Sequence, residues 1–336
     1  MSLTGRMSKY LKASPRKKVM VGVIAALCVA GVLVALLFRT RHPVFPTTPG
    51  ADAIVFVSNR NGSFDLYVIY PDGTHETRLT YLRSEVGEWW FPDILVPYSD
   101  LVTNFRPQPT HDGQGVTFIS NFQGEDYRYQ INLDGADFHR VDSPLSRIHT
   151  AVSSPTGQQI AYLGGDDRLV VSTPDGNSER CLTCGMGGLI LSQAWSPDGQ
   201  TLVFSRFKDK QHNLYRVNVD GTHLLQLTSA PTATLDAFNV EPAWSPDGQQ
   251  IVFASDRDGA FSEIYVMNAD GSNPVRLTSG GAREPSWSPG GEQIAYVASP
   301  DGDKTEIYVM NADGSNQRRL TANPAYDNEP IWVRMR

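Results

Sequence analysis

Residues 239–281 read NVEPAWSPDGQQIVFASDRDGAFSEIYVMNADGSNPVRLTSGG, and residues 282–324 read AREPSWSPGGEQIAYVASPDGDKTEIYVMNADGSNQRRLTANP. The two stretches align without a gap. Each contains four short segments rich in apolar and β-branched residues, separated by clusters of Pro, Gly, Asp and Asn that favour tight turns. A repeat of this length with four strands is typical of one blade of a β-propeller.

The same unit can be traced along the chain by its turns. The Asp-Gly turn between the third and fourth strands recurs at intervals of 62, 41, 45, 50 and 43 residues. The first interval is longer because it carries an insertion at residues 81–104. We therefore predict six blades, with turns at Asp72-Gly73, Asp134-Gly135, Asp175-Gly176, Asp220-Gly221, Asp270-Gly271 and Asp313-Gly314.

The first strands of the repeats predict how the ring closes. The turn that follows a first strand occurs only five times, and the missing first strand is found near the end of the sequence, where residues 328–332 (NEPIW) match NVEPAW. We expect residues 331–333 to be the inner strand of the blade whose outer strands come from residues 54–80. The sequence thus predicts an all-β, six-bladed propeller over residues 54–336, closed by its C-terminal strand so that the ring has no open sheet edge.

The motifs WSPDG, IVFASDRDG and EIYVMNADGSN resemble the repeats of the TolB-like propeller family, which is related to the WD-type propellers. The resemblance covers residues 54–336 and is strongest in the last three blades, whereas the second and third blades lack the tryptophan of the pattern. It favours a non-catalytic scaffold. The separate N-terminal domain of TolB is replaced here by an apolar segment, and the hydrolase domain that follows such repeats in the prolyl-peptidase group is not expected.

The N-terminal region predicts a membrane anchor. Residues 19–38 (VMVGVIAALCVAGVLVALLF) carry no charge, and a helix of this length crosses the roughly 30 Å apolar core of a bilayer. Residues 1–18 are basic and only two Arg residues follow the span, which predicts a cytoplasmic N-terminus and a propeller on the extracytoplasmic side. A cleaved signal peptide and lipidation of Cys28 are disfavoured. Residues 39–53 are Pro-rich and are expected to form a stiff linker.

The charge distribution excludes one class of partner. The whole chain has a net charge of −7, but residues 51–336 alone carry 21 Lys or Arg against 36 Asp or Glu, a net charge of −15. Such a domain repels a phosphate backbone, so nucleic-acid binding is not expected. The expected partners are proteins at the membrane surface, with the lipid bilayer contacted through residues 19–38.

The antiparallel order of the strands assigns the loops to two faces. The turns after the first and third strands share the lower face, which we expect to face the membrane because the linker enters there. The loops after the second strands and the connections between blades share the upper face. The insertion belongs to the upper face, and four of its aromatic residues are candidates for a partner-binding surface or for a flap over the central opening: Trp89, Trp90, Phe91 and Tyr98.

Residues just before the inner strands should surround the mouth of the central tunnel on the upper face. Carboxylates and guanidinium groups in such a ring can hold a cation or a peptide terminus. The alternative is that these groups form structural ion pairs or solvated strand ends. The candidates are Arg106, Thr150, Ser192, Glu241, Arg283, Glu284 and Glu329.

Signatures of catalysis are missing from the sequence. There is no GxSxG elbow, HExxH pair or phosphate-binding glycine loop, so no cofactor or metal is expected. Cys181 and Cys184 form a single CxxC pair, which outside the cytoplasm predicts a local disulfide more than a redox or zinc site. Four tryptophans at one repeat position are expected to pack between blades: Trp195, Trp244, Trp287 and Trp332.

Two functions are compatible with these observations. The first is a non-catalytic protein-interaction scaffold, or a subunit of a membrane or envelope complex, anchored by a single membrane span. The alternative is a glycan- or peptide-binding sensor, or a propeller-type hydrolase or lyase, with its site at the tunnel mouth. An open polar tunnel favours the second function, and an exposed apolar patch at Trp89 and Trp90 favours the first.

Overall fold

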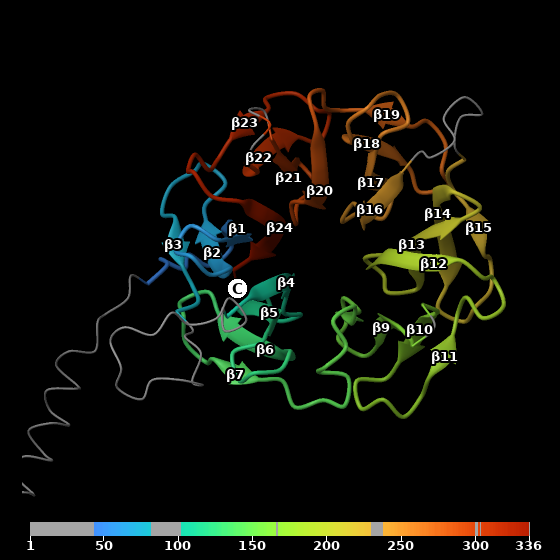
Figure 1. Cartoon of the computed structure of the whole chain (residues 1–336), viewed down its shortest axis with the longest axis horizontal. Helices are drawn as coiled ribbons and strands as arrows, with labels where there is room; N and C mark the ends of the chain where they lie inside the picture. The colour runs from blue at the N-terminus through green and yellow to red at the C-terminus, as the bar shows by residue number, and fades with distance from the viewer. Residues whose placement is uncertain are drawn as a thin grey trace, which may run out of the picture. The chain divides into compact units, whose positions relative to one another are not determined.

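The described residues form six antiparallel sheets of four strands each, arranged in a ring (Figure 1). The computed structural model describes residues 44–81, 102–165, 167–229, 238–299, 302 and 304–335. The predicted all-β, six-bladed propeller is confirmed over this part of the chain. Residues 1–43, with the predicted membrane span, and residues 82–101 of the insertion lie outside the described residues.

Each blade is a meander whose first strand lies toward the centre of the ring (Figure 1). Blade 1 contains β24 (Asp327–Arg334), β1 (Asp52–Ser58), β2 (Asp65–Ile69) and β3 (Thr77–Arg78). Blade 2 contains β4 (Asn104–Pro109), β5 (Gly115–Ser120), β6 (Tyr127–Asn132) and β7 (His139–Arg140). Blade 3 contains β8 (Val152–Ser153), β9 (Ile160–Leu163), β10 (Leu169–Ser172) and β11 (Arg180–Cys181).

The last three blades have the same strand order, and their inner strands are each longer than β8 of blade 3. Blade 4 contains β12 (Leu189–Trp195), β13 (Thr201–Lys208), β14 (Gln211–Asn218) and β15 (Leu225–Gln226). Blade 5 contains β16 (Asn239–Trp244), β17 (Gln250–Ser255), β18 (Glu263–Asn268) and β19 (Val275–Arg276). Blade 6 contains β20 (Ala282–Trp287), β21 (Gln293–Ala298), β22 (Glu306–Asn311) and β23 (Arg318–Arg319).

The ring is closed by pairing of the last strand with the first, as predicted. Strand β24 is antiparallel to β1, with Trp332 opposite Ile54 and Ile331 opposite Val55, and the two strands lie side by side in Figure 1. An ion pair also joins the end of β1 to the start of β24: Arg60 donates to the buried Asp327 carboxylate at 3.1 Å. Residues far apart in the sequence therefore complete one sheet.

The Asp-Gly turns form on the lower face at all six predicted positions, and each glycine has a positive φ. Gly271 shows why a side chain is excluded there. Its φ is +88°, and a Cβ at this position would lie 2.6 Å from the carbonyl oxygen of Leu227 in the preceding blade. The turn thus needs glycine both for its backbone conformation and for close packing of neighbouring blades.

The apolar core lies between neighbouring sheets. The predicted position of the four tryptophans is confirmed, since each belongs to a cluster that joins two blades. Trp195 also donates its indole N–H to the carbonyl of Val152 in blade 3, at 2.9 Å. The boundary between blades 2 and 3 is the least apolar, with only Leu145, Ala151 and Tyr162 buried in its cluster.

The start of the propeller differs from the expected linker at residues 39–53. Strand β1 begins at Asp52, and Phe45 is only 1% exposed because it packs into the cluster between blades 1 and 2. The Tyr70 ring lies 4.8 Å from the Phe45 ring, and its hydroxyl donates to the carbonyl of Pro46 at 2.5 Å. Residues 45–51 are thus part of the domain and pack on its lower face, where the sequence predicted that the chain enters.

The described ranges contain no helix long and apolar enough to cross a bilayer. The predicted span at residues 19–38 does not fall within those ranges.

A buried carboxylate at the start of the third strand fixes the exit from several blades, and sequence reasoning missed it. In blade 5, Glu263 accepts hydrogen bonds from Arg276 (2.8 Å), Thr278 (2.7 Å) and the backbone N–H of Gly280 (2.7 Å). Glu306 makes the same contacts with Arg319 and Thr321 in blade 6. These carboxylates hold the connection that leads to the next inner strand.

Candidate functional site

The inner strands surround a hollow of about 440 Å³ on the axis of the ring. Every blade contributes to its lining, and six of the seven predicted mouth residues meet there: Arg106, Thr150, Ser192, Glu241, Glu284 and Glu329. Because these residues lie before their strands or no later than the middle of them, toward the upper face, the hollow is the upper mouth of the central tunnel.

Four of these residues lie at β-bulges inside the inner strands, not before them as the sequence predicted. Each precedes a proline, and each has a positive φ between 53° and 55°. The register of pairing shifts at these points. Proline has no N–H to give to a ladder and is tolerated at a bulge. The four dipeptides are Arg106-Pro107, Glu241-Pro242, Glu284-Pro285 and Glu329-Pro330.

The bulges free backbone N–H groups to bond across the gap between blades. The N–H of Glu284 donates to Glu241 Oε2 at 2.7 Å, and the N–H of Glu329 donates to Glu284 Oε2 at 2.5 Å. The N–H of Arg106 donates in turn to Glu329 Oε2 at 2.5 Å. One carboxylate oxygen of each glutamate therefore links its blade to the next. These bonds compensate for the positive φ, a conformation that is unfavourable for residues other than glycine.

The same pattern of bonds continues through the other blades. The N–H of Glu241 donates to Ser192 Oγ at 3.1 Å, and Gln193 Nε2 donates to the carbonyl of Thr150 at 2.5 Å. Arg106 Nη1 donates to the carbonyl of His149 at 3.3 Å. Together with the glutamate bonds, these contacts connect each blade to its neighbour all the way round the axis. We call this closed set of contacts the mouth belt.

The carboxyl groups of the mouth belt hold their protons more tightly than ordinary glutamates. Burial, together with the nearby charge of Glu284, raises the pKa of Glu241 to about 7. Burial raises the pKa of Glu329 to about 6 and raises the pKa of Glu284 above its ordinary value. Near neutral pH Glu241 is therefore only partly ionised, which reduces its repulsion with Glu284.

These raised values predict a pH-dependent stability. A glutamate whose pKa is higher in the folded state contributes stability that is complete below its unfolded value, 4.5, and is lost as pH rises through the folded value, about 7 for Glu241. We expect the free energy of unfolding to fall by about 3 kcal/mol between pH 5 and pH 8 through Glu241. Urea unfolding at several pH values measures this decrease.

The matched variant is Glu241→Gln, which keeps an oxygen to accept the Glu284 N–H but cannot ionise. It should remove Glu241's share of the slope, leave the share of Glu284 and Glu329, and be more stable than the wild type at pH 8. Glu292→Gln, at an exposed position, should leave the slope unchanged. Parallel pH profiles for Glu241→Gln and the wild type would show that Glu241 is not the titrating group.

The aspartates of the turns, such as Asp198 and Asp247, do not contribute to this decrease between pH 5 and pH 8. Side-chain hydrogen bonds lower their pKa values, so they titrate below this range.

Arg283 was predicted at the mouth, but it is not among the residues that line the central hollow. Its guanidinium lies 3.3 Å from Glu284 Oε1 and donates to Asn328 Oδ1 at 3.2 Å. It lines a separate upper-face hollow of about 710 Å³, together with Phe261 and Tyr326. Consecutive side chains of a strand point to opposite sides, so Arg283 and Glu284 line different hollows.

The other predicted site residues can be placed only in part. Cys181 and Cys184 are joined by a disulfide in the structure. Trp89, Trp90, Phe91 and Tyr98 lie outside the described residues. Among the described residues, no group of three or more His, Cys, Asp or Glu side chains is arranged to hold a metal ion.

One buried charge between blades 2 and 3 was missed by sequence reasoning. Arg128 lies in β6 between blades 2 and 3 and donates to the carbonyl of Ala151 at 2.8 Å. Burial, with the nearby charge of Arg106, lowers its pKa to about 10. Alignment of the repeats could have indicated this buried charge, because Arg128 occupies the position at which blades 5 and 6 have Ile264 and Ile307. The polar side chain explains why this boundary has the smallest apolar cluster.

Comparison with known proteins finds a family similarity in blades 4 and 5. The family model described as PD40, the TolB beta propeller domain, matches residues 183–284. A protein TolB homolog of Chlorobaculum tepidum is 30% identical over 133 residues, which are 39% of this chain and 30% of that protein. An uncharacterized protein of Agrobacterium fabrum is 29% identical over 173 residues, 48% of this chain and 53% of that protein. The chain thus spans about half or less of these curated relatives.

Solved structures extend the likeness to the whole ring. TolB from Acinetobacter baumannii superimposes with a TM-score of 0.67 and 17% identity, over 88% of this chain and 68% of that one. A putative TolB from Agrobacterium tumefaciens gives 0.56 and 21% identity, over 81% and 88% of the two chains. At these identities the comparison shows the fold. The chain is therefore a six-bladed β-propeller similar to the TolB-like PD40 propellers, and residues 183–284 carry the signature of that family.

Proposed function

We propose that the protein is a non-catalytic interaction scaffold whose upper face binds another protein. The observation that carries this proposal is the distribution of exposed aromatic side chains. Among the described residues, the exposed Phe and Tyr side chains all lie in upper-face connections: Phe64 (37%), Phe238 (43%), Phe261 (69%) and Tyr326 (39%). Aromatic residues are enriched in the energetic centres of protein interfaces.

The mouth belt supports the same proposal. The three glutamates resemble a catalytic cluster in the sequence, but each gives one oxygen to the backbone of the next blade. Because the same bond recurs at equivalent positions of successive blades, it belongs to the architecture of the ring. A scaffold needs such a rigid frame, on which loops can carry the binding residues.

The proposed location is the extracytoplasmic side of a membrane, in a complex of the cell envelope. The basic residues 1–18 and the apolar residues 19–38 support a single span with a cytoplasmic N-terminus. The Cys181–Cys184 disulfide supports an oxidising compartment for the propeller. The likeness to TolB-like propellers supports an envelope location and protein partners.

Cross-linking in native membranes, followed by affinity purification, tests the proposal. We expect Trp89→Ala/Trp90→Ala and Phe261→Ala/Tyr326→Ala to lose a partner that the wild type retains, because these variants remove apolar side chains of the proposed binding surface. The matched control is Val275→Ala, which truncates a side chain that is 54% exposed on the outer strand β19. Equal loss of the partner in the control, or no partner with the wild type, would contradict the proposal.

A ligand site at the tunnel mouth is the alternative, and one observation favours it. The central hollow of about 440 Å³ brings together carboxyl groups whose pKa values, about 7 for Glu241 and about 6 for Glu329, suit proton transfer near neutral pH. A glycan- or peptide-binding sensor, or a hydrolase or lyase, would use these groups. If so, Glu241→Gln should abolish binding or turnover of oligosaccharides or peptides, measured by calorimetry and product release, without loss of the fold.

A further inference from the structure

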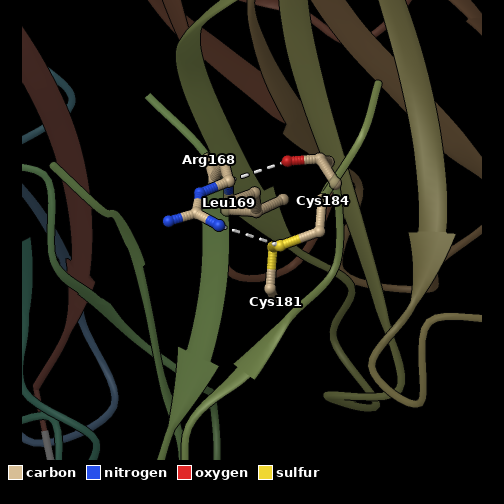
Figure 2. Close-up of a disulfide and its surroundings, with 5 residues drawn as sticks. Arg168, Leu169, Cys181 and Cys184 are labelled. Carbon is tan, nitrogen blue, oxygen red and sulfur yellow. Dashed lines mark hydrogen bonds between the residues drawn. A yellow bond between two sulfur atoms is a disulfide. The ribbon is translucent and has the colours of Figure 1, made fainter. Parts of the chain in front are cut away.

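The Cys181–Cys184 disulfide lies on the upper face, where β11 ends and the connection to β12 begins (Figure 2). Cys184 is exposed and Cys181 is partly exposed. Arg168, in the connection between β9 and β10, directs its guanidinium at the bridge, with Nη1 at 3.3 Å from Cys184 Sγ (Figure 2). A cation therefore contacts one particular sulfur atom of an accessible disulfide.

The surrounding connection is held in place by contacts that do not involve the disulfide. The N–H of Leu169 donates to Thr183 Oγ1 at 2.9 Å, and the N–H of Leu182 donates to the carbonyl of Leu169 at 2.8 Å. Arg206 Nε donates to the carbonyl of Gly187 at 2.7 Å. A bridge between residues three apart closes a very short loop and constrains the unfolded chain little. Opening the disulfide should thus leave blade 3 folded.

A hollow lies on the Cys184 side of the disulfide. It has a volume of about 330 Å³, and Thr183 and Gly185, the two neighbours of Cys184 in the sequence, line it. Arg168 and Ile190 line it as well. The cation, an accessible sulfur and an adjacent hollow are thus found together.

We propose that Cys181–Cys184 is a thiol–disulfide exchange site whose co-reactant is a dithiol of another protein. A thiolate of the partner attacks Cys181 Sγ and forms a mixed disulfide. The bond between the two Sγ atoms breaks, and its electron pair passes to Cys184 Sγ, where Arg168 stabilises the thiolate. The second thiolate of the partner then attacks its own sulfur in the mixed disulfide and releases Cys181. The partner is oxidised to a disulfide, and Cys181 and Cys184 receive its two electrons and two protons.

The charges around the bridge favour Cys184 as the leaving group. The Arg168 guanidinium contacts Cys184 Sγ. The Arg206 guanidinium instead donates to backbone carbonyl groups of the connection between β11 and β12. Asp167, which precedes Arg168 in the sequence, carries a negative charge. A cation in contact with a thiol lowers its pKa, and a thiol of lower pKa leaves faster. The contact with Arg168 thus sets the direction of attack toward Cys181.

The test measures how fast dithiothreitol, a small dithiol, reduces the bridge. The full chain carries Cys28→Ser so that thiol counting reports only Cys181 and Cys184. We expect Arg168→Gln to slow the reduction about three- to tenfold and to raise the pKa of the Cys184 thiol in a Cys181→Ser background. Arg168→Lys should restore most of the rate, because the lysine keeps the charge.

Arg180→Gln is the matched control. It removes the same charge from the residue beside Cys181, where Arg180 donates to the carbonyl of Asp220 at 2.9 Å and does not contact a sulfur. The control should react within about twofold of the wild type. Equal rates for Arg168→Gln and Arg180→Gln would overturn the proposal. It would also be overturned if the Cys181→Ser/Cys184→Ser chain lost the circular dichroism of the propeller, since the bridge would then be needed for folding.

Discussion

A chain that lacks residues 327–336 is expected not to form the propeller. The deletion removes β24 and exposes the whole inner edge of β1, which pairs with it from Asp52 to Ser58. Trp332, Val333 and Met335 are each at most 5% exposed, and burial of such side chains stabilises a protein by about 1.5 to 3 kcal/mol each. Their loss, together with the lost strand pairing, approaches the whole stability of an ordinary domain, about 5 to 15 kcal/mol.

Circular dichroism and limited proteolysis of the truncated chain measure this effect. A synthetic peptide of residues 325–336 is the control, because it can supply the missing strand from solution. The peptide should restore protection from protease, and a scrambled peptide of the same composition should not. A truncated chain that resists protease as well as the full chain does would show that the closing strand is dispensable.

Glu263→Ala is expected to destabilise the protein by about 3 kcal/mol. The Glu263 side chain is only 5% exposed, and it accepts bonds from Arg276, Thr278 and two backbone N–H groups at residues 280 and 281. Removing the carboxylate leaves these donors to find water in a crowded connection. It also releases the segment that positions β20 in the next blade.

Denaturant unfolding at pH 7 measures the loss for Glu263→Ala. The comparison is Glu292→Ala, which removes a carboxylate from an exposed turn of blade 6 and should change the free energy of unfolding by less than about 0.5 kcal/mol. Glu306→Ala should resemble Glu263→Ala, because Glu306 makes the equivalent contacts in blade 6. A loss for Glu263→Ala no greater than that for Glu292→Ala would show that the buried Glu263 carboxylate does not stabilise the connection to the next blade.

The fold could be predicted from the sequence because its signals are local and repeated. Asp-Gly turns specify their own backbone conformation, so six copies mark six hairpins whatever lies between them. The pairing of β24 with β1 is a long-range contact. It could still be predicted, because the sequence between residues 54 and 324 contains six repeats but only five first strands, and the sixth first strand is found near residue 330. The position of the four tryptophans followed in the same way.

The details of the mouth could not be predicted, because they depend on backbone conformations that the repeat pattern does not encode. The pattern brings Glu284 to the opening. The positive φ at Glu284 accompanies the bond from its N–H to Glu241 in the neighbouring blade. Phe45 is a similar case. It lies in a Pro-rich stretch without periodicity, and only the three-dimensional structure reveals the gap between blades 1 and 2 that it fills.

The mouth belt has a consequence for how the molecule comes apart. In a linear array of repeats, the end units have one neighbour and can peel away while the rest stays intact. Here β24 pairs with β1 and the belt links every blade to the next, so no unit is terminal and there is no place for fraying to begin. Melting should consequently be a single all-or-none event, with the calorimetric and van't Hoff enthalpies equal.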